Sequence, residues 1–162
     1  MMDILHFIEM AFWLAIAAIG FAILFNVPKR TLIIIALLAA VGGSSKLLLM
    51  HYGVHIIIGS LIGATLIGIL SIPAAHGKHA PPLVFSIPAV IPMIPGAFAY
   101  KTMLGFIELT SEISTETYDL VLNQTINNAT IAVFVIISLT AGVSFPMLIT
   151  RKTSAKKIKI IS

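Results

Sequence analysis

Hydrophobic residues in this chain gather in five long runs that are separated by short polar stretches. An α-helix needs about 20 mostly apolar residues to cross the hydrocarbon core of a bilayer, and each run meets that length. The pattern predicts transmembrane helices at residues about 4–25, 31–50, 54–72, 83–107 and 126–149. The predicted fold is an all-α membrane bundle of about five helices, forming one domain over residues 1–150 and followed by a basic tail at 151–162.

The fourth predicted helix contains an interruption in the stretch Ile87–Tyr100, which reads I-P-A-V-I-P-M-I-P-G-A-F-A-Y. Proline removes a backbone donor and clashes with the preceding turn, so a continuous helix through Pro88, Pro92 and Pro95 is unfavourable. The spacing predicts a break at about Ile91–Gly96, with Gly96 beginning a second half-helix. Backbone freed in this way is tolerated inside a membrane where it faces protein or a water-filled cavity.

Composition supports the membrane assignment and excludes several functions. The chain is 59% hydrophobic and 10% charged, with a mean hydropathy of +1.08, which excludes a soluble domain of this length. The absence of cysteine excludes disulfides and thiolate metal sites. No basic run is interleaved with aromatic residues, which argues against nucleic-acid binding. No arrangement of residues indicates nucleophilic catalysis, a metal site or a cofactor, so an enzyme is not expected.

Charged residues between the runs predict the orientation, because cytoplasmic loops of membrane proteins accumulate Lys and Arg. Lys29 and Arg30, Lys78 in a predicted loop at Pro73–Pro82, and the basic tail all fall on one side. The N-terminus and an acidic connector, Glu108 to Asp119, fall on the other. We therefore expect the N-terminus outside, the C-terminus and its tail in the cytoplasm, and a solvated acidic connector.

Two features of the predicted helices are candidates for a substrate path. A broken helix can direct the positive end of a half-helix at a substrate carboxylate near the membrane midplane, which would place Pro92, Pro95, Gly96 and Tyr100 along the path. The alternative is a proline kink used only for packing. Lys46 lies inside the second predicted helix, where a cation must pair, face a cavity or extend to the interface. Substrate contact and such snorkelling are both open.

Amides and small residues supply further candidates. Asn123 and Asn127, at the start of the fifth predicted helix, either bond to a neighbouring helix or line a polar path. Gly59 and Gly63 form a G-x-x-x-G pair, and Gly68 belongs to a second pair of small residues at helical spacing. Such pairs predict close helix packing.

Three motifs together resemble the threonine/serine exporter family: G-F-A-I-L-F-N-V-P-K-R at Gly20–Arg30, G-G-S-S-K at Gly42–Lys46, and A-V-I-P-M-I-P-G-A-F-A-Y at Ala89–Tyr100. More narrowly, the chain is similar to the family's short subunit of the YjjB type, which corresponds to the C-terminal half of the fused exporters. The resemblance implies a bacterial inner-membrane exporter of small carboxylates, either threonine and serine or succinate. It also implies a larger membrane subunit as partner.

The residues and the resemblance together favour a subunit of a secondary exporter, since no ATP-binding motif is present. A non-transporting scaffold or regulatory subunit is the alternative, with Gly59, Gly63 and the acidic connector as its interaction surfaces. A homo-oligomeric channel is a third possibility. The motifs do not decide between the substrates.

Overall fold

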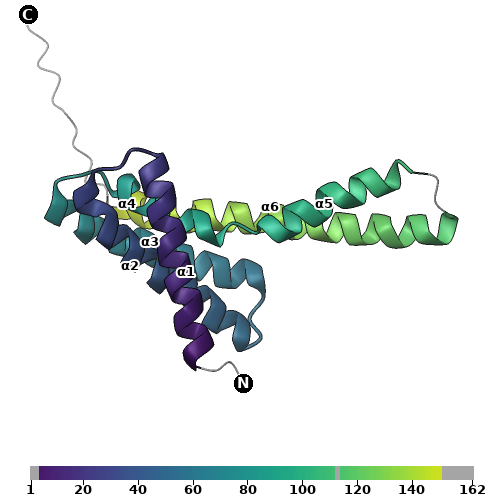
Figure 1. The fold of residues 1–162 in the computed structure, drawn as a ribbon, viewed down its shortest axis with the longest axis horizontal. Coiled ribbons are helices and arrows are strands. Elements are labelled where there is room, and N and C mark those ends of the chain that lie inside the picture. The colour runs from purple at the N-terminus through teal and green to yellow at the C-terminus, as the bar shows by residue number, and fades with distance from the viewer. Residues whose placement is uncertain (1–3, 112–113, 151–162) are drawn as a thin grey trace, which may run out of the picture.

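The computed structural model describes residues 4–111 and 114–150, and every regular element in these ranges is helical (Figure 1). The basic tail and Glu112 of the acidic connector lie outside the described residues. The helices are α1 (Ile4–Leu24), η1 (Lys29–Thr31), α2 (Leu32–His51), α3 (Ile56–Lys78), α4 (Pro82–Val90), η2 (Ile91–Met93), α5 (Gly96–Leu109) and α6 (Thr115–Thr150).

The predicted all-α membrane bundle is confirmed. Four helices in the described ranges are long and apolar enough to cross a membrane, and the count is five if α4–η2 and α5 together form one bent span. Many large apolar side chains on the outside of the bundle are exposed, among them Leu5, Ile33 and Leu148. Exposed apolar side chains of this size and number are suited to lipid, which is consistent with the composition.

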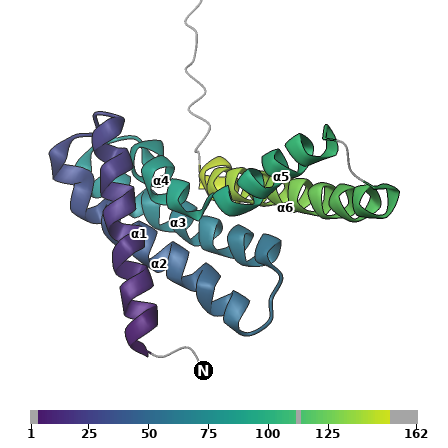
Figure 2. The same cartoon turned by 45° about the vertical axis from the view of Figure 1, so that its right-hand side comes forward.

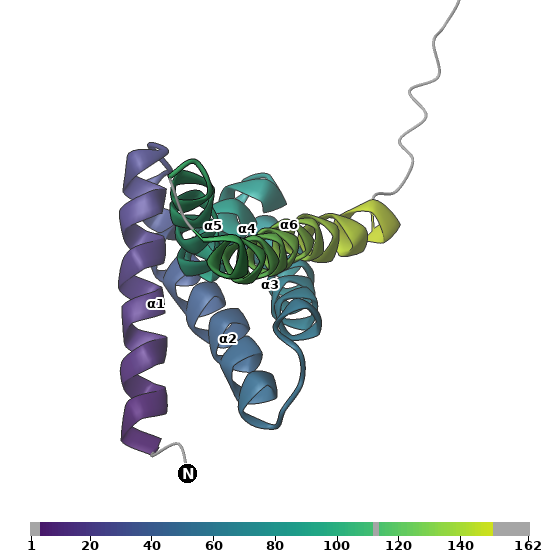
Figure 3. The same ribbon diagram turned by 90° about the vertical axis from the view of Figure 1, so that its right-hand side faces the viewer.

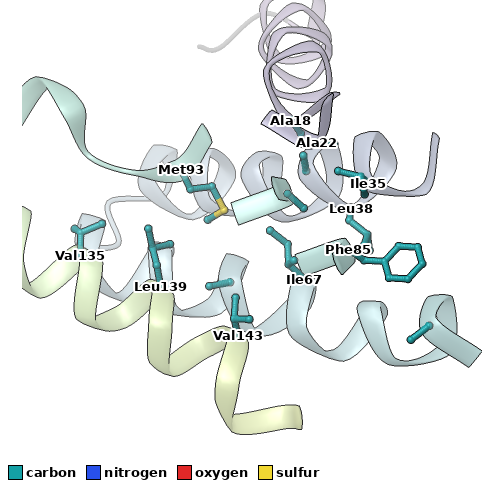
Figure 4. Packing of buried hydrophobic residues seen from close by; sticks show 14 residues of the cluster. Ala18, Ala22, Ile35, Leu38, Ile67, Phe85, Met93, Val135, Leu139 and Val143 are labelled. Atoms are coloured by element: carbon teal, nitrogen blue, oxygen red, sulfur yellow. The ribbon is translucent and has the colours of Figure 1, made fainter. Parts of the chain in front are cut away.

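The buried core lies where α2, α3 and α4 meet the C-terminal half of α6 (Figure 4). Ile35 of α2, Ile67 of α3, Phe85 of α4 and Val135 of α6 are each 0% exposed. Helix α1 contributes the small side chains of Ala18 and Ala22, which lie one helical turn apart. This helix stands upright at one side of the bundle in Figure 3. Small residues on α1 let its backbone approach the core closely.

Glycines permit the closest helix crossings in the bundle. A Cβ atom on Gly63 of α3 would lie 2.5 Å from the carbonyl oxygen of Gly42 in α2. On the other side of α3, a Cβ on Gly68 would lie 2.9 Å from the Val143 carbonyl oxygen of α6. No real side chain tolerates such distances, so these positions require glycine for α2, α3 and α6 to cross as they do.

The predicted loop at Pro73–Pro82 is wrong over its first half, because α3 continues through Pro73 to Lys78. A single proline removes one helical hydrogen bond, and membrane helices tolerate this loss. The helix ends instead at His79, whose φ of 50° is left-handed and whose successor, Ala80, bonds back to the Ala75 carbonyl at 3.2 Å. This is the Schellman type of helix end.

The fifth predicted helix also differs in length, since α6 begins at Thr115 and not at residue 126. Helix α5 runs antiparallel to the N-terminal half of α6, and the two helices together project from the rest of the bundle (Figures 1 and 2). They cross where Gly105 of α5 meets the buried side chain of Thr125. With 36 residues, α6 is roughly 54 Å long, well beyond the hydrocarbon thickness of about 30 Å.

Candidate functional site

The predicted break in the fourth helix is confirmed. Helix α4 ends at Val90, a short 3₁₀ turn covers Ile91–Met93, and α5 begins at Gly96. The two halves are bent by 54°. Ile94 has extended backbone angles, and Pro95 stands immediately before α5.

Not every proline contributes to this break. Pro88 lies inside α4, and Pro146 lies inside α6. Pro92 and Pro95 are only three residues apart, and together they remove two donors from one turn. Ile91 before Pro92 keeps helical angles, whereas Ile94 before Pro95 is extended, so the chain leaves the helical path at Ile94. The break therefore falls on the second and third prolines of the predicted stretch and spares the first.

Most backbone groups at the break find local partners. The Ile94 amide donates to the Ile91 carbonyl at 3.0 Å, and the Gly96 amide donates to the Ile94 carbonyl at 2.9 Å. The Pro95 carbonyl accepts from the amides of Phe98 and Ala99. The carbonyl of Met93 accepts no backbone amide from the described part of the chain, which leaves a buried acceptor that must be satisfied in another way.

Lys46 supplies that donor. Its ammonium, carried on α2, donates to the Met93 carbonyl oxygen at 2.9 Å, across 47 positions of sequence. The Lys46 residue is only 8% exposed, so its head group lies inside the bundle and not at the helix end. Gly42 and Gly43, in the preceding turn, keep α2 thin enough for α3 and α1 to approach on either side.

A pocket of about 350 Å³ opens beside this hydrogen bond. Trp13 and Leu14 of α1 form one wall, and Leu47, Pro92 and Met93 form the others. Lys46 is the charged residue in an otherwise apolar lining. The Lys46 pocket, as we call it, therefore combines a cation with mainly apolar walls.

The substrate-path candidates predicted from the sequence do not all lie in one site. Lys46 and Pro92 line the Lys46 pocket, while Pro95 and Gly96 lie next to it along the chain without lining it. Tyr100 is 64% exposed on α5. Asn123 and Asn127 lie on α6, away from the break, and Asn127 lines a separate cavity between α5 and α6.

This second cavity has a volume of about 440 Å³ and a polar lining. We call it the α5–α6 cavity; its polar residues include Lys101, Glu108, Gln124, Asn127 and Asn128. Sequence reasoning missed Lys101, although the signal was present: a lysine inside the predicted fourth span. Neither Asn127 nor Asn128 makes a side-chain hydrogen bond within residues 4–111 and 114–150.

The three packing candidates all face helices of this same chain. Gly59 approaches the Lys46 carbonyl of α2, and Gly63 approaches Gly42. Gly68 meets α6 at Gly142, Val143 and Pro146. The G-x-x-x-G pair is therefore used inside the bundle, directly behind the helix that carries Lys46.

Comparison with known proteins gives a family. The model of the family described as threonine/serine exporter, ThrE, matches residues 10–149. An uncharacterized protein of Haemophilus influenzae is 40% identical over 95 residues, which are 59% of this chain and 32% of that relative. The match thus spans about a third of the relative's length, and no solved structure matches the chain. Because the family match covers most of the sequence, the chain belongs to the threonine/serine exporter family, ThrE.

Proposed function

We propose that this chain is one subunit of a secondary exporter for small carboxylates, either threonine and serine or succinate. It works with a larger membrane subunit that resembles the N-terminal half of the family. Membership of the exporter family supports the transport role. We further propose that the complex lies in a bacterial cytoplasmic membrane, with the N-terminus of this chain outside and its C-terminus inside.

The observation that carries this proposal is the position of the Lys46 ammonium. An ammonium has three donors, and within the described chain Lys46 uses one of them, on the Met93 carbonyl. The ion pair found among the described residues, His6 with Glu9, does not involve Lys46. A cation inside a membrane bundle without a protein carboxylate is suited to a ligand that brings its own.

The broken helix adds to this suitability. Helix α5 begins three residues after Met93, and the N-terminal end of a helix carries partial positive charge. A substrate carboxylate in the Lys46 pocket accepts hydrogen bonds from the two ammonium donors that Met93 leaves free, and its charge draws the ammonium toward it. Substrate binding then alters the contact that ties α2 to the break, which gives a route from binding to a change in the bend.

The scaffold alternative has less support. It assigned Gly59 and Gly63 to a surface for another protein, and both glycines are occupied by α2 of this chain. The acidic connector is only partly described. We therefore favour transport over a purely structural role.

Reconstitution tests the proposal. The chain and its candidate larger subunit are placed in liposomes loaded with labelled threonine or succinate. Efflux is compared with that from equally loaded liposomes that contain no protein. We expect efflux of at least one substrate, and loss of it in Lys46→Ala while the two subunits still assemble. Lys78→Ala, at the last residue of α3, is the control. Efflux of neither substrate above the background would overturn the exporter assignment, and loss of assembly alone would favour the scaffold.

A further inference from the structure

The lining of the Lys46 pocket supplies one charge and very few other polar groups. Among the described residues that form it, the side chains other than Lys46 are hydrocarbon or thioether groups, one glycine, and the indole of Trp13. Glu9, which precedes the lining residue Met10 in α1, does not line the pocket, and its carboxylate lies 3.7 Å from the ring of His6. A ligand in this pocket therefore meets a cation and an apolar surface.

The cation is held at a defined place before any ligand arrives. Lys46 is only 8% exposed, and its ammonium donates to the Met93 carbonyl at 2.9 Å. Helix α3 packs against the stem of Lys46, since a Cβ at Gly59 would lie 3.8 Å from the Lys46 Cγ. An ammonium has three donors, so those that Met93 leaves free are available to one ligand carboxylate.

A second charge on the ligand finds no equivalent partner in this lining. A ligand ammonium directed at the Met93 carbonyl would lie beside the ammonium of Lys46, and the two cations would repel each other. A second carboxylate could accept from the indole N–H of Trp13, which carries no charge to neutralise it. Placing a charge against apolar groups without a partner is costly, so either addition should weaken binding.

An apolar remainder on the ligand suits the same lining. The pocket has a volume of about 350 Å³, and Leu14, Leu47 and Met93 contribute hydrocarbon or thioether surface to it. Each methylene that moves from water onto such a surface strengthens binding about fourfold. Charge and apolar surface therefore favour the same kind of ligand.

We propose that the Lys46 pocket binds monocarboxylates whose remaining part is apolar, such as butyrate, in preference to amino acids and dicarboxylates with the same carbon chain. This inference rests on the proposed function, in which the pocket receives a substrate carboxylate, and it adds a ligand class to those proposed there. It also separates the roles of the two subunits, because recognition of the second charge of threonine or succinate then falls to the larger subunit.

Competition binding to the full chain in nanodiscs at pH 7 tests the inference. Labelled butyrate is the probe. The competitors are unlabelled butyrate, L-2-aminobutyrate and succinate, which share a four-carbon chain and differ in their charged groups. We expect saturable butyrate binding that empty nanodiscs lack, and competition by L-2-aminobutyrate and succinate that is weaker by about 10-fold or more. Valerate, with one more methylene, should compete about fourfold more strongly than butyrate.

Variants of the lining test whether this pocket is the site. Lys46→Gln keeps a donor for Met93 but should weaken butyrate binding about 10-fold or more. Met10 lines the pocket and is 37% exposed, so Met10→Glu adds an anion at its edge. We expect this variant to improve L-2-aminobutyrate relative to butyrate about 10-fold, because the ligand ammonium gains a partner. Ile8→Glu, at an exposed position of α1 outside the lining, is the matched control and should leave the preference unchanged.

Equal competition by the three four-carbon acids in the unaltered chain would overturn the inference. It would also be overturned by a folded chain that does not bind butyrate, by butyrate binding that survives in Lys46→Gln, or by a preference that Met10→Glu leaves unchanged. Efflux of threonine or succinate by the reconstituted complex, without a butyrate preference in the chain, would leave the exporter proposal standing alone. A butyrate preference without efflux of either substrate would leave only the inference standing.

Discussion

The ammonium of Lys46 donates to the carbonyl of Met93 at 2.9 Å and thereby joins the middle of α2 to the break between α4 and α5. Both partners are buried, with 8% and 3% of their surfaces exposed. The carbonyl is available only because the break removes its helical donor, and the lysine is tolerated only because it finds an acceptor and a pocket. Each feature thus accounts for the presence of the other.

Lys46 holds the Met93 carbonyl, and in the proposed function it also supplies the positive charge for a substrate carboxylate. Replacing the charge while keeping the hydrogen bond separates these two roles. Lys46→Gln retains an amide donor for the Met93 carbonyl but has no charge to offer a carboxylate. We expect the thermal midpoint in detergent to stay close to that of the unaltered chain and carboxylate efflux to fall about 10-fold or more. A variant that unfolds readily yet transports normally when folded would show that the lysine serves the fold alone.

Restoring backbone donors at the break should straighten it. In a Pro92→Ala, Pro95→Ala double variant both amides return, and a continuous helix becomes available. Spin labels on cysteines introduced at the exposed Leu83 and Met103 report the distance between α4 and α5. We expect a longer distance than in the unaltered chain, whose halves are bent by 54°, together with reduced efflux. Pro88→Ala, inside α4, is the control, and the same distance in all three proteins would contradict this prediction.

The break itself was predictable from the sequence, because the steric effect of proline is local. Pro92 and Pro95 determine it together with the start of α5 at Gly96. Local rules were less reliable for Pro73, where packing in the bundle and the apolar surroundings keep α3 helical. Proline positions therefore indicated where a break could occur, and tertiary structure determined which positions break.

The partners of polar residues were not predictable, because they depend on contacts distant in sequence. The acceptor for Lys46 is 47 residues away and is a backbone carbonyl, which leaves no mark in the sequence. Lys101 was overlooked among apolar neighbours, and only the antiparallel pairing of α5 with α6 places it opposite Asn127 and Asn128. The sequence could identify charges inside predicted helices as candidates but could not show which residues each of them would meet.

The crossing of α2 and α3 should be sensitive to a single methyl group. In Gly63→Ala the new Cβ would lie 2.5 Å from the Gly42 carbonyl oxygen and 2.7 Å from the Met93 methyl group. Overpacking of this kind costs about 1–3 kcal/mol, so we expect a lower thermal midpoint. Gly20→Ala is the matched control, since nothing lies within 4 Å of a Cβ at that position in α1. Equal midpoints for the two variants would show that the helices separate freely here.

Removing the buried hydroxyl of Ser60 should not lower stability, in contrast to the added methyl group of Gly63→Ala. The Ser60 side chain is 0% exposed, and its Oγ has no hydrogen-bond partner among the described residues. Ser60→Ala removes an unsatisfied polar group and should leave stability unchanged or raise it by up to about 1 kcal/mol. Ser71, equally buried, donates to the Gly68 carbonyl at 2.7 Å, and Ser71→Ala should not stabilise. A Ser60→Ala variant that folds well but loses efflux would instead identify the hydroxyl as part of the substrate path.

We expect the broken helix to cross the membrane and not to return to the side from which it entered. The two halves, α4–η2 and α5, are together roughly 35 Å long end to end even when bent, which is sufficient for a core of about 30 Å. Lys78 precedes the broken helix and Ser111 follows it, and the chain has no native cysteine, so single cysteines at these positions can be labelled selectively. We expect a membrane-impermeant maleimide added to intact cells to label Ser111→Cys but not Lys78→Cys, and to label both after the cells are opened. Labelling of both from outside, or of neither, would place the two ends of the broken helix on the same side. That outcome would make α4–α5 a re-entrant loop and remove the predicted separation between the basic and acidic loops.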